Sequence, residues 1–199
     1  MDSKMCRSSQ PTATYESGDG QATRARLLPE RRFPPYAYLP GRFPHPVRHP
    51  LGHSYKTEDL AKPGSPYEEF RWGADLFNHG YYWEAHEAWE GLWQKANQRT
   101  PERQFYKALI LLSATGVKLR QGKVSPAIRH YGKAKDLLQQ LQRDRPGAFD
   151  ARLGLTVPQL LGCLSGMEMS EDLRSDEPRS VFPFTLVPVT ERFARQSEL

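Results

Sequence analysis

The segment YYWEAHEAWEGLW, residues 81–93, decides the fold because it mixes aromatic and ionisable side chains at helical spacing. On a helical wheel of about 100° per residue, His86 and Glu90 lie one turn apart on the aromatic face. Glu84 falls on the opposite face, which predicts that it is exposed, and Glu87 falls at the boundary. The segment therefore predicts an amphipathic helix in which His86 and Glu90 form a buried pair.

Helical patterns continue on both sides of this segment. Before it, Phe70, Ala74 and Phe77 recur at spacings of three and four, and Gly80 suits a helix C-terminus. After it, Thr100-Pro101 predicts a helix start, because Thr can cap the first turn and Pro is tolerated there. Similar starts occur at Ser125 and at Thr156. The side chains expected to face the core are Phe105, Ala108, Leu109, Leu112, Gly116 and Leu119 in the third helix, Ile128, Tyr131, Ala134, Leu138 and Leu141 in the fourth, and Leu160, Leu161 and Leu164 in the fifth.

These patterns predict an all-α fold, a compact antiparallel bundle of four to five helices joined by short loops. The polar residues 1–30 are expected to form a disordered tail. Residues 31–66 combine prolines, which prevent a long helix, with aromatic residues, and predict an extended arm that packs on the helices. The helical domain is expected over 67–170, and an extended tail over 171–199.

Charge and composition narrow the classes of protein. Residues 1–62 carry ten lysines and arginines against six aspartates and glutamates, which accounts for +4 of the net charge of +5. The expected helical domain has no basic stripe, so we do not expect nucleic acid as a partner. RNA contact through the arm arginines is the alternative, and it would show steep salt dependence. Cys6 and Cys163 are too few for a disulfide framework, and Cys163 is expected to act as a small apolar residue.

Nothing in the sequence predicts membrane insertion. No segment approaches the roughly 20 apolar residues that span a bilayer. The first residues, MDSKMCRSSQ, have no apolar run behind their charges, so a secretory signal is not expected. We therefore expect a cytoplasmic protein.

The string HEAWE, residues 86–90, is similar to the HExxH zinc-protease helix, with Glu in place of the last His. Imidazole and carboxylate suit Zn, Mn or Fe, so His86 and Glu90 are candidate metal ligands and Glu87 is the candidate base. A catalytic site needs about three protein ligands, and the helix itself does not supply an obvious third. Other candidates for the third ligand are His79, in the turn before this helix, and Asp75 and His130, on other helices. The hydrolase hypothesis completes the shell with one of the arm histidines, His45, His49 or His53.

A structural alternative explains the same residues. A buried histidine and glutamate commonly satisfy each other and lock helix packing. In this interpretation Tyr82, Trp83 and Trp93 pack or contact a ligand, and the chain is a module that binds a protein or a small molecule. We favour this binding module over a metal-dependent hydrolase.

LFNHGYYWEAHEAWEGLW (76–93), RQFYKALILLSATGVKLRQGK (103–123) and KAKDLLQQL (133–141) together resemble the domain of unknown function 309 (DUF309) family. The resemblance covers roughly residues 67–165 and implies an all-helical bundle of about a hundred residues. It also implies a possible metal-dependent hydrolase, a label given to some members. Positions where many members carry glutamine, histidine or other polar residues are occupied here by Leu111, Val117 and Lys118, which favours the binding module.

Overall fold

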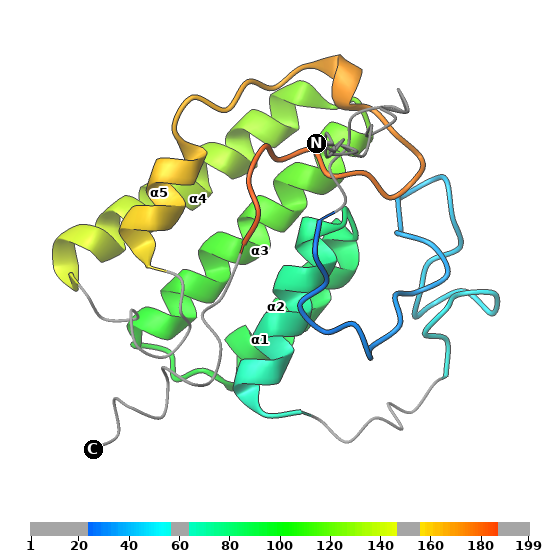
Figure 1. The fold of residues 1–199 in the computed structure, drawn as a ribbon, viewed down its shortest axis with the longest axis horizontal. Coiled ribbons are helices and arrows are strands. Elements are labelled where there is room, and N and C mark those ends of the chain that lie inside the picture. The colour runs from blue at the N-terminus through cyan, green and yellow to red at the C-terminus, as the bar shows by residue number, and fades with distance from the viewer. Residues whose placement is uncertain (1–23, 57–63, 147–155, 187–199) are drawn as a thin grey trace, which may run out of the picture.

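The structure is a computed structural model that describes residues 24–56, 64–146 and 156–186. Within these ranges the chain forms helices and irregular segments but no strand (Figure 1), so the predicted all-α class is confirmed. None of the described helices is both long and apolar enough to cross a membrane. The helices are α1 (Pro66–Asn78), α2 (Tyr82–Lys95), α3 (Pro101–Arg120), α4 (Val124–Asp144), α5 (Val157–Leu164) and the short 3₁₀ helix η1 (Glu171–Leu173).

Local sequence signals start three of these helices. Ser65 forms a capping box with Glu68 at α1, and Thr156 forms one at α5. The Thr100 side chain accepts a hydrogen bond from the backbone N–H of Arg103 at α3. These side chains satisfy N–H groups that have no partner within the helix. The expected Ser125 cap of α4 does not form. α4 begins two residues earlier than predicted, at Val124, with Lys123 at the N-cap position and no side-chain cap.

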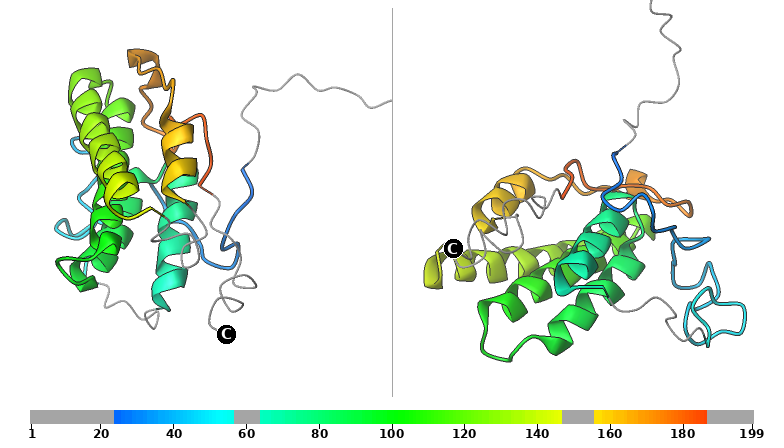
Figure 2. Two further views of the ribbon diagram at one scale, coloured as in Figure 1. Left: turned by 90° about the vertical axis from the view of Figure 1, so that its left-hand side faces the viewer. Right: turned by 60° about the horizontal axis from the view of Figure 1, so that its bottom comes forward.

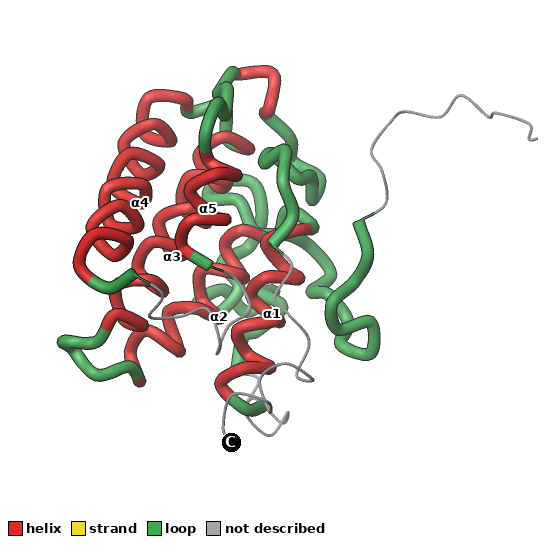
Figure 3. Tube along the Cα trace, turned by 60° about the vertical axis from the view of Figure 1, so that its left-hand side comes forward, coloured by secondary structure: helices red, strands yellow, loops and turns green. Residues whose placement is uncertain are grey.

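Successive helices pack side by side, in the order α1, α2, α3, α4 and α5 (Figures 1 and 3). Short turns join the first four, so the chain reverses at each turn. The predicted core face of α3 is buried throughout. On α4, the predicted core residues Ala134, Leu138 and Leu141 are buried, but in the first turn Ile128 is 54% exposed and the neighbouring Ala127 is buried instead. Cys163, expected to act as a small apolar residue, is exposed.

Close contacts with glycine bury two aromatic residues of α2, Tyr82 and Trp89, between α1 and α3. A Cβ atom on Gly73 of α1 would lie 2.3 Å from Nε1 of Trp89, and one on Gly116 of α3 would lie 2.5 Å from the ring of Tyr82. Both aromatic side chains are fully buried. The helices can therefore approach only because these two positions have no side chain.

The segment after α5, residues 165–186, contains η1 and returns to the helical bundle (Figure 1). The Asn78 side chain donates to the carbonyl of Leu186 at 2.7 Å and accepts from its N–H at 2.8 Å. The hydroxyl of Tyr82 accepts from the N–H of Val181 at 2.8 Å, and Phe182 stacks on Phe77. These contacts fix the end of this segment on the bundle.

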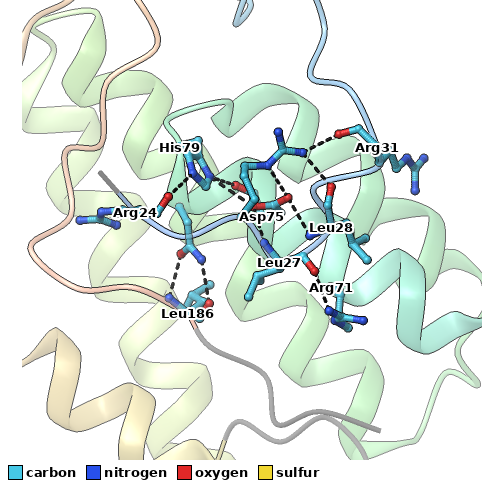
Figure 4. Close-up of polar contacts among 10 residues, drawn as sticks. Arg24, Leu27, Leu28, Arg31, Arg71, Asp75, His79 and Leu186 are labelled. Atoms are coloured by element: carbon cyan, nitrogen blue, oxygen red, sulfur yellow. Dashed lines mark hydrogen bonds and ion pairs between the residues drawn. The ribbon is translucent and has the colours of Figure 1, made fainter. Parts of the chain in front are cut away.

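The N-terminal segment, residues 24–56, lies along α1 and α2 on the side away from α4 (Figure 2). Its attachment centres on Asp75, whose side chain is fully buried. Asp75 accepts hydrogen bonds from Arg26 Nε at 2.8 Å and from the N–H groups of Leu27 and Leu28 at 3.1 and 3.2 Å (Figure 4). Residues 24–30 are thus packed on α1, although they fall in the stretch expected to be disordered.

Replacing Asp75 by alanine is expected to lower the free energy of unfolding by about 3 kcal/mol, because it leaves buried N–H groups and Arg26 without their acceptor. Chemical denaturation of the full chain measures the change. The matched control is Asp136→Ala, at an exposed position of α4, which should stay within about 0.5 kcal/mol of the parent. Equal effects of the two substitutions would contradict the role of Asp75.

Candidate functional site

Three potential metal ligands lie together on α2. His86, Glu87 and Glu90 can each offer a ligand atom such that all three atoms lie within 4.8 Å of one another. His86 Nε2 lies 3.4 Å from Oε2 of Glu90, and these side chains are 30% and 37% exposed. His86 and Glu90 therefore lie together as predicted, but the prediction that this pair is buried is wrong. The buried face of α2 instead carries Tyr82, Glu84, Ala85, Trp89 and Leu92.

Two tryptophans account for this error. Trp83 and Trp93 were placed on the core face, but both are only partly buried at its edge. The ring of Trp93 is covered by Arg103 at 3.9 Å and Lys107 at 5.0 Å, both from α3. Cations stack favourably on tryptophan faces at the surface, so these rings do not mark the centre of the core. Of the three aromatic candidates only Tyr82 is a fully buried core residue.

The pKa values of this group are shifted by burial. Burial lowers the pKa of His86 below its ordinary 6.5, although Glu90 opposes this shift. Glu87 is exposed at the surface, but partial burial of its carboxylate raises its pKa above 4.5, and the charges of Glu90 and Glu84 add to that rise. The arrangement therefore favours a neutral imidazole, the form that binds metals, beside a carboxylate that readily accepts a proton.

A cavity of about 370 Å³ lies between the N-terminal segment and helices α1 and α2. The N-terminal segment contributes Arg31, His53 and Ser54 to its lining, and α1 contributes Trp72. Glu87 of α2 lines it as well, so this residue belongs both to the cavity and to the potential metal-binding group. The cavity and the group are therefore adjacent.

A buried histidine–glutamate pair lines this cavity, but it is formed by His53 and Glu84. Their side chains are 6% and 5% exposed, with His53 Nε2 at 3.2 Å from Glu84 Oε1. The same oxygen accepts the N–H of Tyr38 at 2.8 Å, and His53 Nδ1 lies 2.8 Å from the hydroxyl of Ser54. Glu84 Oε2 is buried and has no hydrogen-bond partner among the residues that the structure describes. The prediction that Glu84 is exposed is therefore wrong.

The sequence could not single out this pair. The N-terminal segment, and not another helix, covers Glu84, so helical periodicity on its own assigns Glu84 to water. The three arm histidines look alike in sequence but differ in structure: His45 and His49 accept hydrogen bonds from the backbone of their own loop, at Val47 and Leu51. Among the described residues, the ligand group on α2 includes no arm histidine. The expected completion of the metal shell from the arm is thus not seen.

Residues 70–130 match the model of the family described as Domain of unknown function (DUF309). The resemblance predicted from the motifs is confirmed over this range, which covers most of α1, all of α2 and α3 and the first part of α4. Neither a curated protein nor a solved structure matches the chain.

Proposed function

We propose that the chain is a small helical binding module whose ligand occupies the cavity between the N-terminal segment and helices α1 and α2. The observation that carries this proposal is the buried His53–Glu84 pair in the cavity lining. Burying such groups destabilises a fold unless they are paired or used, and ionisable groups gathered in a cavity are typical of binding sites. Concave sites with aromatic walls and a few placed polar groups commonly hold small ligands.

The domain division follows from the same proposal. The arm predicted at 31–66 supplies one wall of the cavity, and the helical unit at 67–170 supplies the other. We therefore treat these two parts as one functional unit. The stretches 1–30 and 171–199 flank it, and their described residues, 24–30 and 171–186, do not line the cavity. The ligand is a small molecule or a side chain of a partner protein, and not nucleic acid.

Filling the cavity should abolish ligand binding without unfolding the chain. Gly91 of α2 lines the cavity, and a Cβ atom added there meets nothing within 4 Å, so Gly91→Leu places its side chain in the cavity. The matched control is Gly132→Leu in α4, where the added atom is equally free. Removing either glycine from a helix interior should preserve or slightly raise stability.

The measurement is ligand-observed NMR with a fragment library of mixed charge. Fragments that bind the parent and the Gly132→Leu protein should lose their signal with the Gly91→Leu protein. A library without a single such fragment would contradict the proposed site.

A metal-dependent hydrolase is the second candidate, favoured by the grouping of His86, Glu87 and Glu90. One imidazole and two carboxylates fit Zn, Mn or Fe. His86 and Glu90 would hold the ion, and it would supply an activated water when bound. Glu87, with its raised pKa, suits the role of proton acceptor at the edge of the cavity.

This candidate predicts about one equivalent of Zn, Mn or Fe in protein purified without a chelating tag, measured by elemental analysis. His86→Ala should remove it and remain folded by circular dichroism, while His49→Ala, at an exposed position, should retain it. Protonation of His86 competes with the metal. Because its pKa lies below 6.5, binding should persist at pH 6.5 and weaken only at lower pH.

A parent protein that takes up no metal from excess, or a His86→Ala protein that binds as the parent does, would eliminate the hydrolase candidate. The cavity proposal does not depend on this result, because His53 and Glu84 lie outside the ligand group.

A further inference from the structure

One carboxylate oxygen of Glu84, Oε2, has no hydrogen-bond partner among the described residues and is therefore the candidate contact for a ligand. Oε1 of this carboxylate already has two partners, the N–H of Tyr38 and Nε2 of His53. Oε2 is equally buried but has none among the described residues. A carboxylate oxygen only accepts hydrogen bonds, so the missing group is a donor. Buried polar atoms are nearly always paired, which makes this atom a candidate contact.

The charges around the cavity decide what kind of donor fits. Arg31 already pairs with Glu69 at 3.1 Å and lies over the ring of Trp72 at 4.3 Å. The lining carries two further acidic side chains, Glu69, which pairs with Arg31, and Glu87 of α2. A cation in the cavity is attracted by the carboxylates of Glu84 and Glu87, whereas an anion is repelled by them. The remaining lysine or arginine among the described lining residues is Lys95, which is exposed at the rim. None of these described residues therefore places an unpaired lysine or arginine inside the cavity.

We propose that the cavity binds an alkylammonium group, with the ammonium donating a hydrogen bond to Oε2 of Glu84 and the carbon chain lying against the cavity's apolar lining. This inference rests on the proposed function and names its ligand class. A primary ammonium carries three N–H donors, so it can satisfy Oε2 and still donate to Glu87. Trp83 and Leu92 supply apolar surface for the chain, and a cation near a tryptophan face is stabilised further.

The ammonium group can come from a free small amine or from a lysine side chain of a partner protein. The chemistry of the contact is the same in both cases. A cavity of about 370 Å³ is large enough for a phenylethyl or butyl chain, which leaves both sources open to test.

The test is calorimetric titration of the full chain with 2-phenylethylamine, 2-phenylethanol and phenylacetate, in buffer that contains a chelator. These probes share a ring and differ in charge at one end. The amine should bind at least about tenfold more tightly than the alcohol, because a charge-assisted hydrogen bond is roughly twice as strong as a neutral one. Phenylacetate should bind most weakly.

Two variants locate the contact. Glu84→Gln keeps an acceptor for Tyr38 and His53 but loses the charge, and it should weaken amine binding at least about tenfold while the alcohol changes little. Glu168→Gln removes an exposed carboxylate outside the cavity lining and should bind as the parent does. The peptide acetyl-Gly-Lys-Gly-amide and its Nζ-acetylated form distinguish the sources: competition by the first alone supports a lysine side chain, and no competition supports a free amine.

The possible outcomes distinguish a failure of the alkylammonium assignment from a failure of the cavity as a binding site. If all three probes bind equally and Gly91→Leu blocks them, the cavity is a binding site but the alkylammonium assignment is wrong. Tighter binding of phenylacetate than of the amine would also overturn the assignment. If no probe binds and the fragment library gives no hit, both the assignment and the proposed function fail.

Discussion

The structure depends on two buried carboxylates that bind backbone N–H groups of an irregular segment. Asp75 of α1 accepts from Leu27 and Leu28, and Glu84 of α2 accepts from Tyr38. A segment so rich in proline cannot pair its backbone N–H and C=O groups in a helix or sheet, because proline has no backbone N–H and its φ angle is fixed. The two carboxylates supply acceptors in place of a sheet or a helix. They hold the N-terminal segment against the bundle. The cavity lies between that segment and helices α1 and α2, so it depends on this attachment.

This arrangement explains how one carboxylate can serve both fold and function. Oε1 of Glu84 is engaged by Tyr38 and His53, which fixes the side chain and its orientation. Oε2 has no partner among the described residues, so the proposed ligand would meet an acceptor that is already fixed in place. Glu87, three residues further along α2, lies at the boundary between the cavity and the ligand group around His86. A bound cation and a bound metal ion would therefore influence each other through this residue.

The helical core could be predicted from sequence, while the site largely could not. The caps at Thr100 and Thr156 follow from local sequence patterns. The apolar face of α3 could also be predicted, because neighbouring helices bury it as one continuous stripe. The face of α2 was assigned wrongly because the helical wheel assumes that water covers every side chain opposite the core. Here the N-terminal segment covers Glu84 instead, and the contact joins residues 46 positions apart. No local periodicity records such a contact.

Amide hydrogen exchange of the full chain, followed by NMR, tests this account most directly. If Asp75 and Glu84 hold the N-terminal segment, the N–H groups of Leu28 and Tyr38 should exchange at least about a hundredfold more slowly than in an unstructured peptide. The exposed N–H of Val47, in the same segment, provides the internal comparison and should exchange much faster. Rapid exchange at Leu28 and Tyr38, with slow exchange in α3, would mean that the segment is not held and that the cavity does not persist in solution.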